Sequence, residues 1–173
     1  MKYTRIDTEI GIFGITWTGK GVRNVALPGG SRIESWVAEG AVPGEPEGAL
    51  AAVPDMIRRY AQGEQIDFTD VPLDLDGITE FNRKAYAELL KIGYGETTTY
   101  GAIARTLGDV ALSRSVGTAM GQNRIPLLIP CHRVLGANGK PVGFSAPGGV
   151  TSKMRLLALE HAALPTGQYA FGF

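Results

Sequence analysis

The spacing of apolar residues changes near Gly77, and this change constrains the possible fold more than any other feature. Before Gly77, short apolar runs alternate with turn residues, and residues 21–27 alternate apolar and polar side chains after a turn at residues 18–21. Alternation with period two is typical of half-buried strands, so residues 10–27 predict a β-hairpin. After Gly77, apolar residues recur every three or four positions, which is typical of helices. We therefore predict an α+β protein with an α/β domain at residues 1–77 and a helical domain at residues 78–173.

Turn and capping residues mark further elements. In the first half, residues 31–39 fit a strand or a short helix, residues 40–48 fit a loop, and residues 53–62 fit a helix with a proline in its first turn. Residues 68–75 predict a strand that Pro72 confines to a sheet edge or a bulge. In the second half, Thr79 and Thr99 are suited to cap helices that run to about residue 92 and over residues 100–107. A third helix fits residues 111–122.

Charge is divided unevenly between the two halves. The whole chain has 17 basic and 17 acidic side chains, but residues 1–77 hold 7 basic against 12 acidic, and residues 78–173 hold 10 against 5. A basic half that contains two short helices joined by a glycine-containing turn points to a DNA-binding helix-turn-helix. The alternatives are two differently charged surfaces without a partner, and a helix pair of an ordinary bundle.

Composition excludes several classes of protein. No apolar run reaches the ~18 residues of a spanning helix, and the charged first nine residues lack the apolar stretch of a signal peptide. The single cysteine, Cys131, excludes an intrachain disulfide and a cysteine-cluster zinc site. We therefore expect an intracellular protein, cytoplasmic in a bacterium, with no membrane segment.

The segment around Cys131 has the strongest chemical pattern in the chain. Two prolines, Pro126 and Pro130, enclose a short aliphatic run, and Cys131 and His132 follow directly. A cysteine beside a histidine on a rigid, buried segment suits an activated thiolate nucleophile. A buried structural cysteine is the alternative, and on a strand the two neighbouring side chains would point to opposite faces.

Residues 129–134, Ile-Pro-Cys-His-Arg-Val, resemble the active-site signature of the 6-O-alkylguanine-DNA alkyltransferases, also called methylated-DNA–protein-cysteine methyltransferases. The resemblance runs from about Thr79 to Ala162, and residues 1–77 match only loosely. Further motifs match in the same order, at residues 95–100, 114–120, 123, 143–145, 148–149, 153 and 156–160.

This resemblance implies a fold, an activity and partners. The first domain is expected to be ribonuclease H-like, and the second to carry a helix-turn-helix or winged helix with the active-site cysteine. The implied activity is direct repair of double-stranded DNA. The damaged nucleotide is flipped out, and the alkyl group of 6-O-alkylguanine or 4-O-methylthymine moves irreversibly to Cys131, once per molecule. The implied protein is a monomer that uses no cofactor and no metal.

The resemblance also assigns five catalytic residues. Cys131 accepts the alkyl group, His132 is its base through a bridging water, and Glu160 orients the imidazole. Asn123 ties the recognition helix to the active-site segment, and Tyr100 hydrogen-bonds the purine ring as guanine departs. Without the resemblance, Glu160 would be read as a solvated helix-end carboxylate and Tyr100 as a core residue.

Seven further residues are implied to bind the substrate or DNA. Arg114 fills the space left by the flipped-out nucleotide, with a phosphate contact as the alternative. Small side chains beside it permit close approach to DNA, and loop residues near Cys131 contact the guanine. Besides Arg114, the expected set is Ser113, Ser115, Gly117, Val134, Ser145 and Lys153.

The sequence also departs from some relatives. Its two histidines, His132 and His161, both lie in the second half, so the zinc site that some relatives hold in the first domain is not expected. The stretch 145–148 is slightly longer than in some members, which leaves the shape of the substrate pocket open. Two other functions compete with DNA repair: a winged-helix regulator with a structural cysteine, and a cysteine hydrolase.

Overall fold

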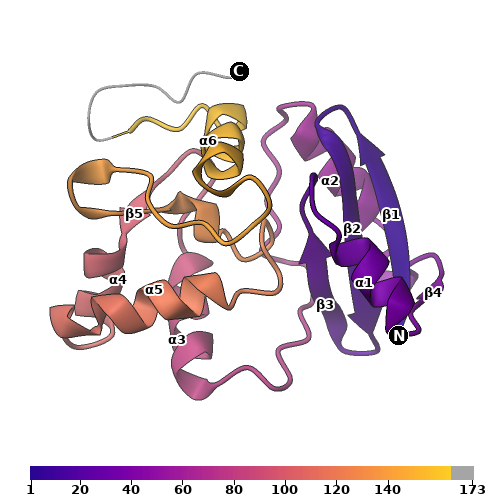
Figure 1. Ribbon diagram of the computed structural model, residues 1–173, viewed down its shortest axis with the longest axis horizontal. Coiled ribbons are helices and arrows are strands. Elements are labelled where there is room, and N and C mark those ends of the chain that lie inside the picture. The colour runs from indigo at the N-terminus through magenta and orange to yellow at the C-terminus, as the bar shows by residue number, and fades with distance from the viewer. Residues whose placement is uncertain (165–173) are drawn as a thin grey trace. The chain divides into compact units, whose positions relative to one another are not determined.

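Three antiparallel strands begin the chain. The computed structural model describes residues 1–164, and in it β1 (Lys2–Thr8) pairs with β2 (Gly11–Thr18), which pairs with β3 (Gly21–Ala26) (Figure 1). The predicted hairpin at residues 10–27 is confirmed. β1 was not among the predicted elements, although its burial also alternates: Thr4 and Ile6 are buried, while Lys2 and Arg5 are exposed.

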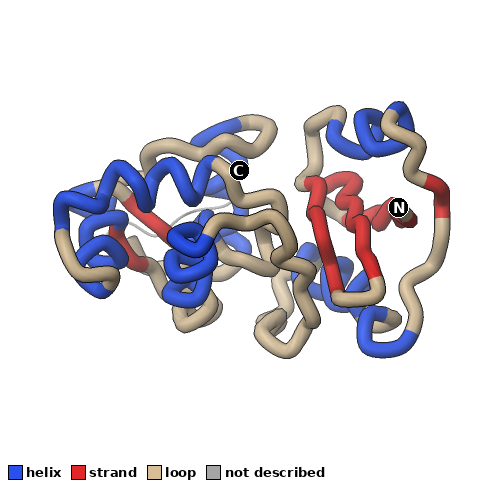
Figure 2. The backbone as a smooth tube through the Cα atoms, turned by 90° about the horizontal axis from the view of Figure 1, so that it is seen from below, coloured by secondary structure: helices blue, strands red, loops and turns tan. Residues whose placement is uncertain are grey.

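Two helices and a short edge strand complete this sheet. β4 (Val42–Pro43) pairs in parallel with β1, so the strand order is β3-β2-β1-β4. α1 (Arg32–Ala38) and α2 (Val53–Ala61) lie on opposite faces of the sheet (Figures 1 and 2). A Cβ atom at Gly14 would come within 2.8 Å of Ile33, so the absence of a side chain there lets α1 pack directly on β2. The structure resolves residues 31–39 as a helix and confirms the helix at residues 53–62.

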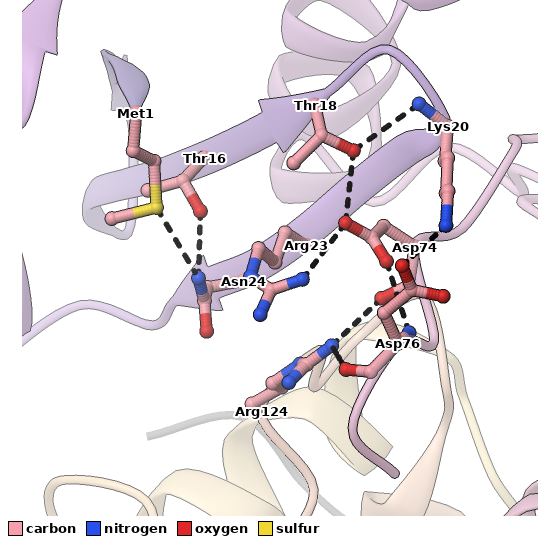
Figure 3. Close-up of polar contacts among 9 residues, drawn as sticks. All are labelled: Met1, Thr16, Thr18, Lys20, Arg23, Asn24, Asp74, Asp76 and Arg124. Carbon is pink, nitrogen blue, oxygen red and sulfur yellow. Dashed lines mark hydrogen bonds and ion pairs between the residues drawn. The ribbon is translucent and has the colours of Figure 1, made fainter.

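The predicted strand at residues 68–75 is wrong, because side-chain bonds rather than a ladder hold this segment. Only Leu73 bridges to β3, through bonds from the Val22 amide to the Pro72 carbonyl and from the Asp74 amide to the Val22 carbonyl, each 2.8 Å. The buried Asp74 carboxylate accepts bonds from the Thr18 hydroxyl (2.8 Å) and from the Arg23 guanidinium (2.9 Å) (Figure 3). Pro72 has no N–H to continue a ladder.

Five residues from the second half of the sequence, 124–128, belong to this first unit. The Val25 amide donates to the Arg124 carbonyl (2.9 Å), and Arg124 Nη2 donates to the carbonyls of Asp74 (2.9 Å) and Asp76 (2.8 Å) (Figure 3). Ile125, Leu127 and Leu128 are buried. The first unit therefore consists of two stretches of chain, Met1–Asp76 and Arg124–Leu128. A single boundary at residue 77 describes the first stretch but leaves out the second.

The second unit comprises Gly77–Asn123 and the described chain from Ile129 onward, and it is mainly helical. Its helices and strands are α3 (Glu80–Leu89), β5 (Thr98–Thr99), α4 (Tyr100–Thr106), α5 (Ser113–Gly121), β6 (Val134–Leu135) and α6 (Gly149–Leu159). Thr79 and Thr99 accept bonds from the third amide of α3 and α4, so both predicted caps are confirmed. α5 starts two residues later than predicted, after a short 3-10 turn at Val110–Leu112.

Two contacts join separate elements of this unit, one between helices and one between strands. The buried Tyr86 hydroxyl of α3 donates to the Ala119 carbonyl of α5 (2.7 Å). β5 pairs in parallel with β6, which follows the cysteine segment directly. The chain as a whole is mixed α/β, as its patterns predict in coarse form. Within residues 1–164, no helix is both long and apolar enough to cross a membrane.

Candidate active site

A pocket of about 560 Å³ opens in the second unit, and Cys131 forms part of its wall. Three other predicted site residues, Tyr100, Gly117 and Ser145, also line it. The remaining walls are apolar side chains and glycine backbone from α5 and from the loop that precedes α6: Met120, Gly121, Val142, Gly143 and Phe144. An apolar pocket with a few convergent polar groups is the usual form of a small-ligand site.

Cys131 lies in a 3-10 turn, Cys131–Arg133, and not in a strand. Three successive side chains therefore leave the backbone in different directions, and the opposed faces expected of a strand do not arise. The cysteine is only 5% exposed, and burial raises the pKa of its thiol. A hydrogen bond from Asn123 and the charge of Lys153 act in the opposite direction. The buried thiol therefore stays protonated, and a nearby base is needed to convert it into the reactive thiolate.

A buried carboxylate stands behind the neighbouring histidine. His132 Nε2 lies 2.7 Å from Glu160 Oε1, and the side chains of both residues are at most 1% exposed. Glu160 follows the last residue of α6 and is therefore not the solvated helix-end carboxylate that its sequence position alone suggests. Burial acts to raise the pKa of Glu160, but His132 and Arg133 outweigh it and hold that pKa well below its usual range.

Arg133 belongs to this network, although sequence reasoning gave it no role. Its guanidinium donates from Nε to Glu160 Oε2 (2.9 Å) and from Nη2 to Glu160 Oε1 (3.0 Å). Its Nη1 donates to the Ile92 carbonyl (2.6 Å). The signal in the sequence is an arginine that directly follows Cys131 and His132 and stands within a mostly aliphatic run, residues 127–135.

Asn123, Tyr100 and Ser145 each bond to backbone carbonyls around the pocket. Asn123 Nδ2 donates to the Ile129 carbonyl (2.9 Å), two residues before Cys131. The Tyr100 hydroxyl lies 3.2 Å from the carbonyls of Val142 and Gly143, and the Ser145 hydroxyl donates to the Gly121 carbonyl (3.1 Å). Tyr100 and Ser145 thus hold parts of the pocket wall in place, whereas Asn123 holds the segment before Cys131 and does not itself line the pocket.

Lys153 is fully buried on α6 and is not among the residues that line the pocket. Its Nζ donates to the Val142 carbonyl (3.2 Å) and lies 5.7 Å from the ring centre of Tyr100 and 5.9 Å from that of Phe144. Burial lowers the pKa of Lys153 to about 8. The structure therefore places this residue behind the pocket wall, where it supports Tyr100 and the loop.

The other expected DNA-binding residues lie in two places. Ser113, Arg114 and Ser115 form the first turn of α5, where Arg114 and Ser115 are exposed and the Ser113 hydroxyl bonds to the Val110 carbonyl (2.6 Å). Val134 is buried in β6 and does not line the pocket. No group of three or more metal-binding side chains occurs within residues 1–164.

Comparison with known proteins gives the same family from several directions. The family model described as 6-O-methylguanine DNA methyltransferase, DNA binding domain, matches residues 80–162. The methylated-DNA–protein-cysteine methyltransferase of Mycobacterium tuberculosis is 37% identical over 95% of each chain. The protein of the same name from Methanosarcina acetivorans is 37% identical over 92% of this chain and 98% of its own.

Solved structures agree with these relatives. The crystal structure of Mycobacterium tuberculosis OGT in complex with DNA has a TM-score of 0.76 and 38% sequence identity, and the match covers 92% of each chain. An O6-methylguanine DNA methyltransferase from Methanococcus jannaschii has a TM-score of 0.62 and 28% identity, over 91% of this chain and 92% of its own. The match therefore includes the first unit as well as the pocket.

Proposed function

This chain belongs to the methylated-DNA–protein-cysteine methyltransferase family and is a DNA-repair alkyltransferase. We propose that Cys131 accepts the alkyl group and that the substrate is 6-O-alkylguanine in duplex DNA. The observation that carries the proposal is a buried thiol in the wall of an apolar pocket, followed in the chain by a histidine held by an ionised carboxylate. Neither a structural cysteine nor a simple DNA-binding helix pair requires this arrangement.

The relay moves one proton before the alkyl group moves. Because the Glu160 carboxylate can only accept a hydrogen bond, His132 Nε2 carries the hydrogen, and Nδ1 keeps its lone pair. Nδ1, through a bridging water, takes the proton from the Cys131 thiol, and Glu160 stabilises the imidazolium that forms. The thiolate sulfur then attacks the alkyl carbon, and the carbon–oxygen bond breaks with its electron pair left on guanine.

The pocket can stabilise the departing guanine. Tyr100 brings a hydroxyl into the pocket from α4, and Ser145 brings one from the loop before α6. Both hydroxyls donate to backbone carbonyls of the pocket wall, so each would turn its hydrogen toward the guanine that enters. Donors placed where negative charge develops lower the barrier. Guanine, still part of its DNA strand, takes up the proton that His132 took from the thiol, while a thioether remains on Cys131. A thioether has no good leaving group, so each molecule acts once.

The substrate atom lies inside the base stack, so we propose that the damaged nucleotide is flipped into the pocket. α4 and α5 would form a helix-turn-helix in which the exposed first turn of α5 meets the DNA and Arg114 fills the gap. 4-O-methylthymine carries its alkyl group at the same pairing edge and would enter the same way. We further propose that a monomer suffices, since one chain supplies thiol, base and pocket.

The first unit fits a ribonuclease H-like fold in one respect, on which we base that assignment. Its sheet combines three sequential antiparallel strands with a fourth that is parallel to the first. The two-domain division near residue 77 remains our proposal for the chain's organisation, with residues 124–128 as the exception described above.

Intact mass after mixing with a methylated-guanine oligonucleotide tests the proposed function directly. We expect a gain of one methylene unit per molecule, located on Cys131 by peptide mapping, and no further turnover with excess DNA. DNA binding without any mass gain would favour the regulator. Repeated turnover of an ester or amide without DNA would favour the hydrolase.

Cys131→Ser is expected to abolish transfer and leave DNA affinity nearly unchanged. A hydroxyl ionises far above a thiol, whose pKa is ordinarily ~8.5, so the relay cannot generate the anion. The exposed face of α5, which is expected to contact DNA, is unaltered. Single-turnover transfer and a binding titration check both halves, and transfer near the wild-type rate would contradict the acceptor assignment.

A further inference from the structure

Arg133 makes two hydrogen bonds to Glu160, one to each carboxylate oxygen, whereas His132 makes one. The two donors, Nε and Nη2, form the planar fork that matches a carboxylate edge to edge. Because both oxygens are held at once, the carboxylate cannot rotate about its last bond without breaking the pair. The guanidinium therefore determines the direction in which Oε1 faces His132.

The segment that follows α3 also contacts the Arg133–Glu160 pair. Arg133 Nη1 donates to the Ile92 carbonyl (2.6 Å), and the Gly95 amide lies 3.3 Å from Glu160 Oε2. Gly95 has a φ of +75°, and a Cβ atom there would come within 2.9 Å of the Glu160 carbonyl. The segment after α3 is thus fitted closely against Glu160, and Glu160 and Arg133 have little freedom to move separately.

We propose that Arg133 is a positioning residue of the alkyl transfer: its guanidinium fork fixes the Glu160 carboxylate so that Oε1 orients His132 toward the thiol of Cys131. The inference rests on the proposed function, because it assumes that His132 is the base. Charge balance supports it. Before proton transfer the four groups carry +1 on Arg133, −1 on Glu160 and none on the other two. After transfer, His132 carries +1 and Cys131 carries −1, so the sum stays zero.

Arg133 could instead be a structural ion pair that only joins three segments. Such a role would lower stability when Arg133 is replaced but would leave the chemistry of the folded protein unchanged. A positioning role acts on the proton relay, so it alters how fast the thiolate forms and at which pH. The two roles therefore differ in the reactivity of the folded protein, which is the quantity to measure.

Arg133→Lys separates charge from geometry, because an ammonium keeps the positive charge but loses the planar fork. We expect the single-turnover transfer rate at saturating methylated-guanine DNA to fall about tenfold to a hundredfold, with DNA affinity unchanged. We also expect the pH profile of Cys131 alkylation by iodoacetamide, followed by intact mass, to move to higher pH. In that reaction the sulfur–carbon bond forms and iodide leaves. Arg155→Lys, an exposed position on α6, is the matched control and should change neither quantity.

A wild-type rate and pH profile in folded Arg133→Lys would overturn the inference. A second test uses Glu160→Gln: if Arg133 acts through Glu160, adding Arg133→Lys to Glu160→Gln should cause no further slowing, and additional slowing would contradict it. The iodoacetamide profile needs no DNA. If wild type fails to accept a methyl group but its profile still depends on Arg133, the proposed function falls and the relay inference stands.

Discussion

The buried ammonium of Lys153 makes a prediction about stability and pH. Burial lowers its pKa from about 10.5 in the unfolded chain to about 8 in the folded protein. Between these values the unfolded chain binds the proton more tightly, so the contribution of Lys153 to stability rises from pH 8 to pH 10.5 and is at its least favourable below pH 8. Lys153→Met is therefore expected to raise the free energy of unfolding at pH 7, by up to about 3 kcal/mol.

Urea unfolding of wild type and Lys153→Met at pH 7 and pH 10 measures this effect. The difference between the two proteins should shrink at the higher pH, because wild type gains there and the variant has no such group. An equal difference in the free energy of unfolding at both pH values would show that burial does not disfavour the charged form of Lys153.

Residues that act through a local pattern could be predicted from the sequence, whereas residues that act through a distant partner could not. Cys131 and His132 are adjacent in the sequence, and the resemblance supplied Glu160, which the structure brings to 2.7 Å of His132. Arg133 had the same neighbours but no predicted role. The role of Arg133 depends on the carboxylate of Glu160, which lies 27 residues away, and on a burial that composition does not reveal.

At the scale of elements, α5 carries the prediction for Arg114. If this exposed arginine replaces a flipped-out base, Arg114→Ala should slow repair of duplex DNA by about tenfold or more. Transfer from the free alkylated base should change little, because the free base needs no extrusion. Arg114→Lys should recover only part of the loss, since an ammonium lacks the fork that can bond an orphaned base.

Single-turnover rates on both substrates at saturating DNA decide the role of Arg114. Ser115→Ala, in the same exposed turn, is the control for general loss of DNA contact. An equal fractional loss on duplex and free base would contradict the gap-filling role, and full recovery with lysine would favour a phosphate contact.

The Asp74 cluster gives a second prediction at this scale. Burial acts to raise the pKa of the Asp74 carboxyl, but bonds from the Asp76 amide, Thr18 and Arg23 outweigh it and lower that pKa to about 2. The stabilisation is therefore complete above pH 4 and is lost as the pH falls from 4 to 2. Asp74→Asn should lower Tm by roughly 5 °C at pH 7 and by much less at pH 2.

Asp76→Asn is the matched control for Asp74→Asn, since Asp76 is more than half exposed and its pair with Lys20 is expected to contribute little. Thermal melts of both variants across this pH range make the test. A similar loss at pH 7 and pH 2 would show that Asp74 stabilises by packing rather than by charge.

Elements with local signals were predicted well, and elements that depend on distant partners were not. The caps Thr79 and Thr99 bond within their own first turns, so a short window of sequence contains their cause. β1 pairs with its neighbour β2 through a tight turn but also with β4, and Lys2 lies opposite Val42. Residues 68–75 form a single bridge, from Leu73 to Val22 of β3, because Pro72 has no N–H to extend a ladder. A short window of sequence does not contain these distant partners.

For the whole molecule, the uneven charge predicts how DNA binding responds to salt. Residues 78–173 carry a basic excess of 10 against 5, so only a handful of phosphates can be neutralised. Affinity should therefore be modest, and it should fall by about two orders of magnitude between roughly 50 and 200 mM salt through counterion release. Titrations of duplex DNA at the two salt concentrations check this, and salt-independent binding would contradict the role assigned to the basic half.

The passage of residues 124–128 through the first unit also sets an order of events during synthesis. Residues 77–123, which belong to the second unit, are made in between. At ~5–20 residues per second, the nascent first unit waits about 2–10 s for Arg124 to reach Asp74 and Asp76 and for Ile125 and Leu127 to fill their places. A ribosome stalled just before residue 124 should therefore hold an N-terminal half that proteases still cut, and one stalled well beyond residue 128 should hold a resistant one.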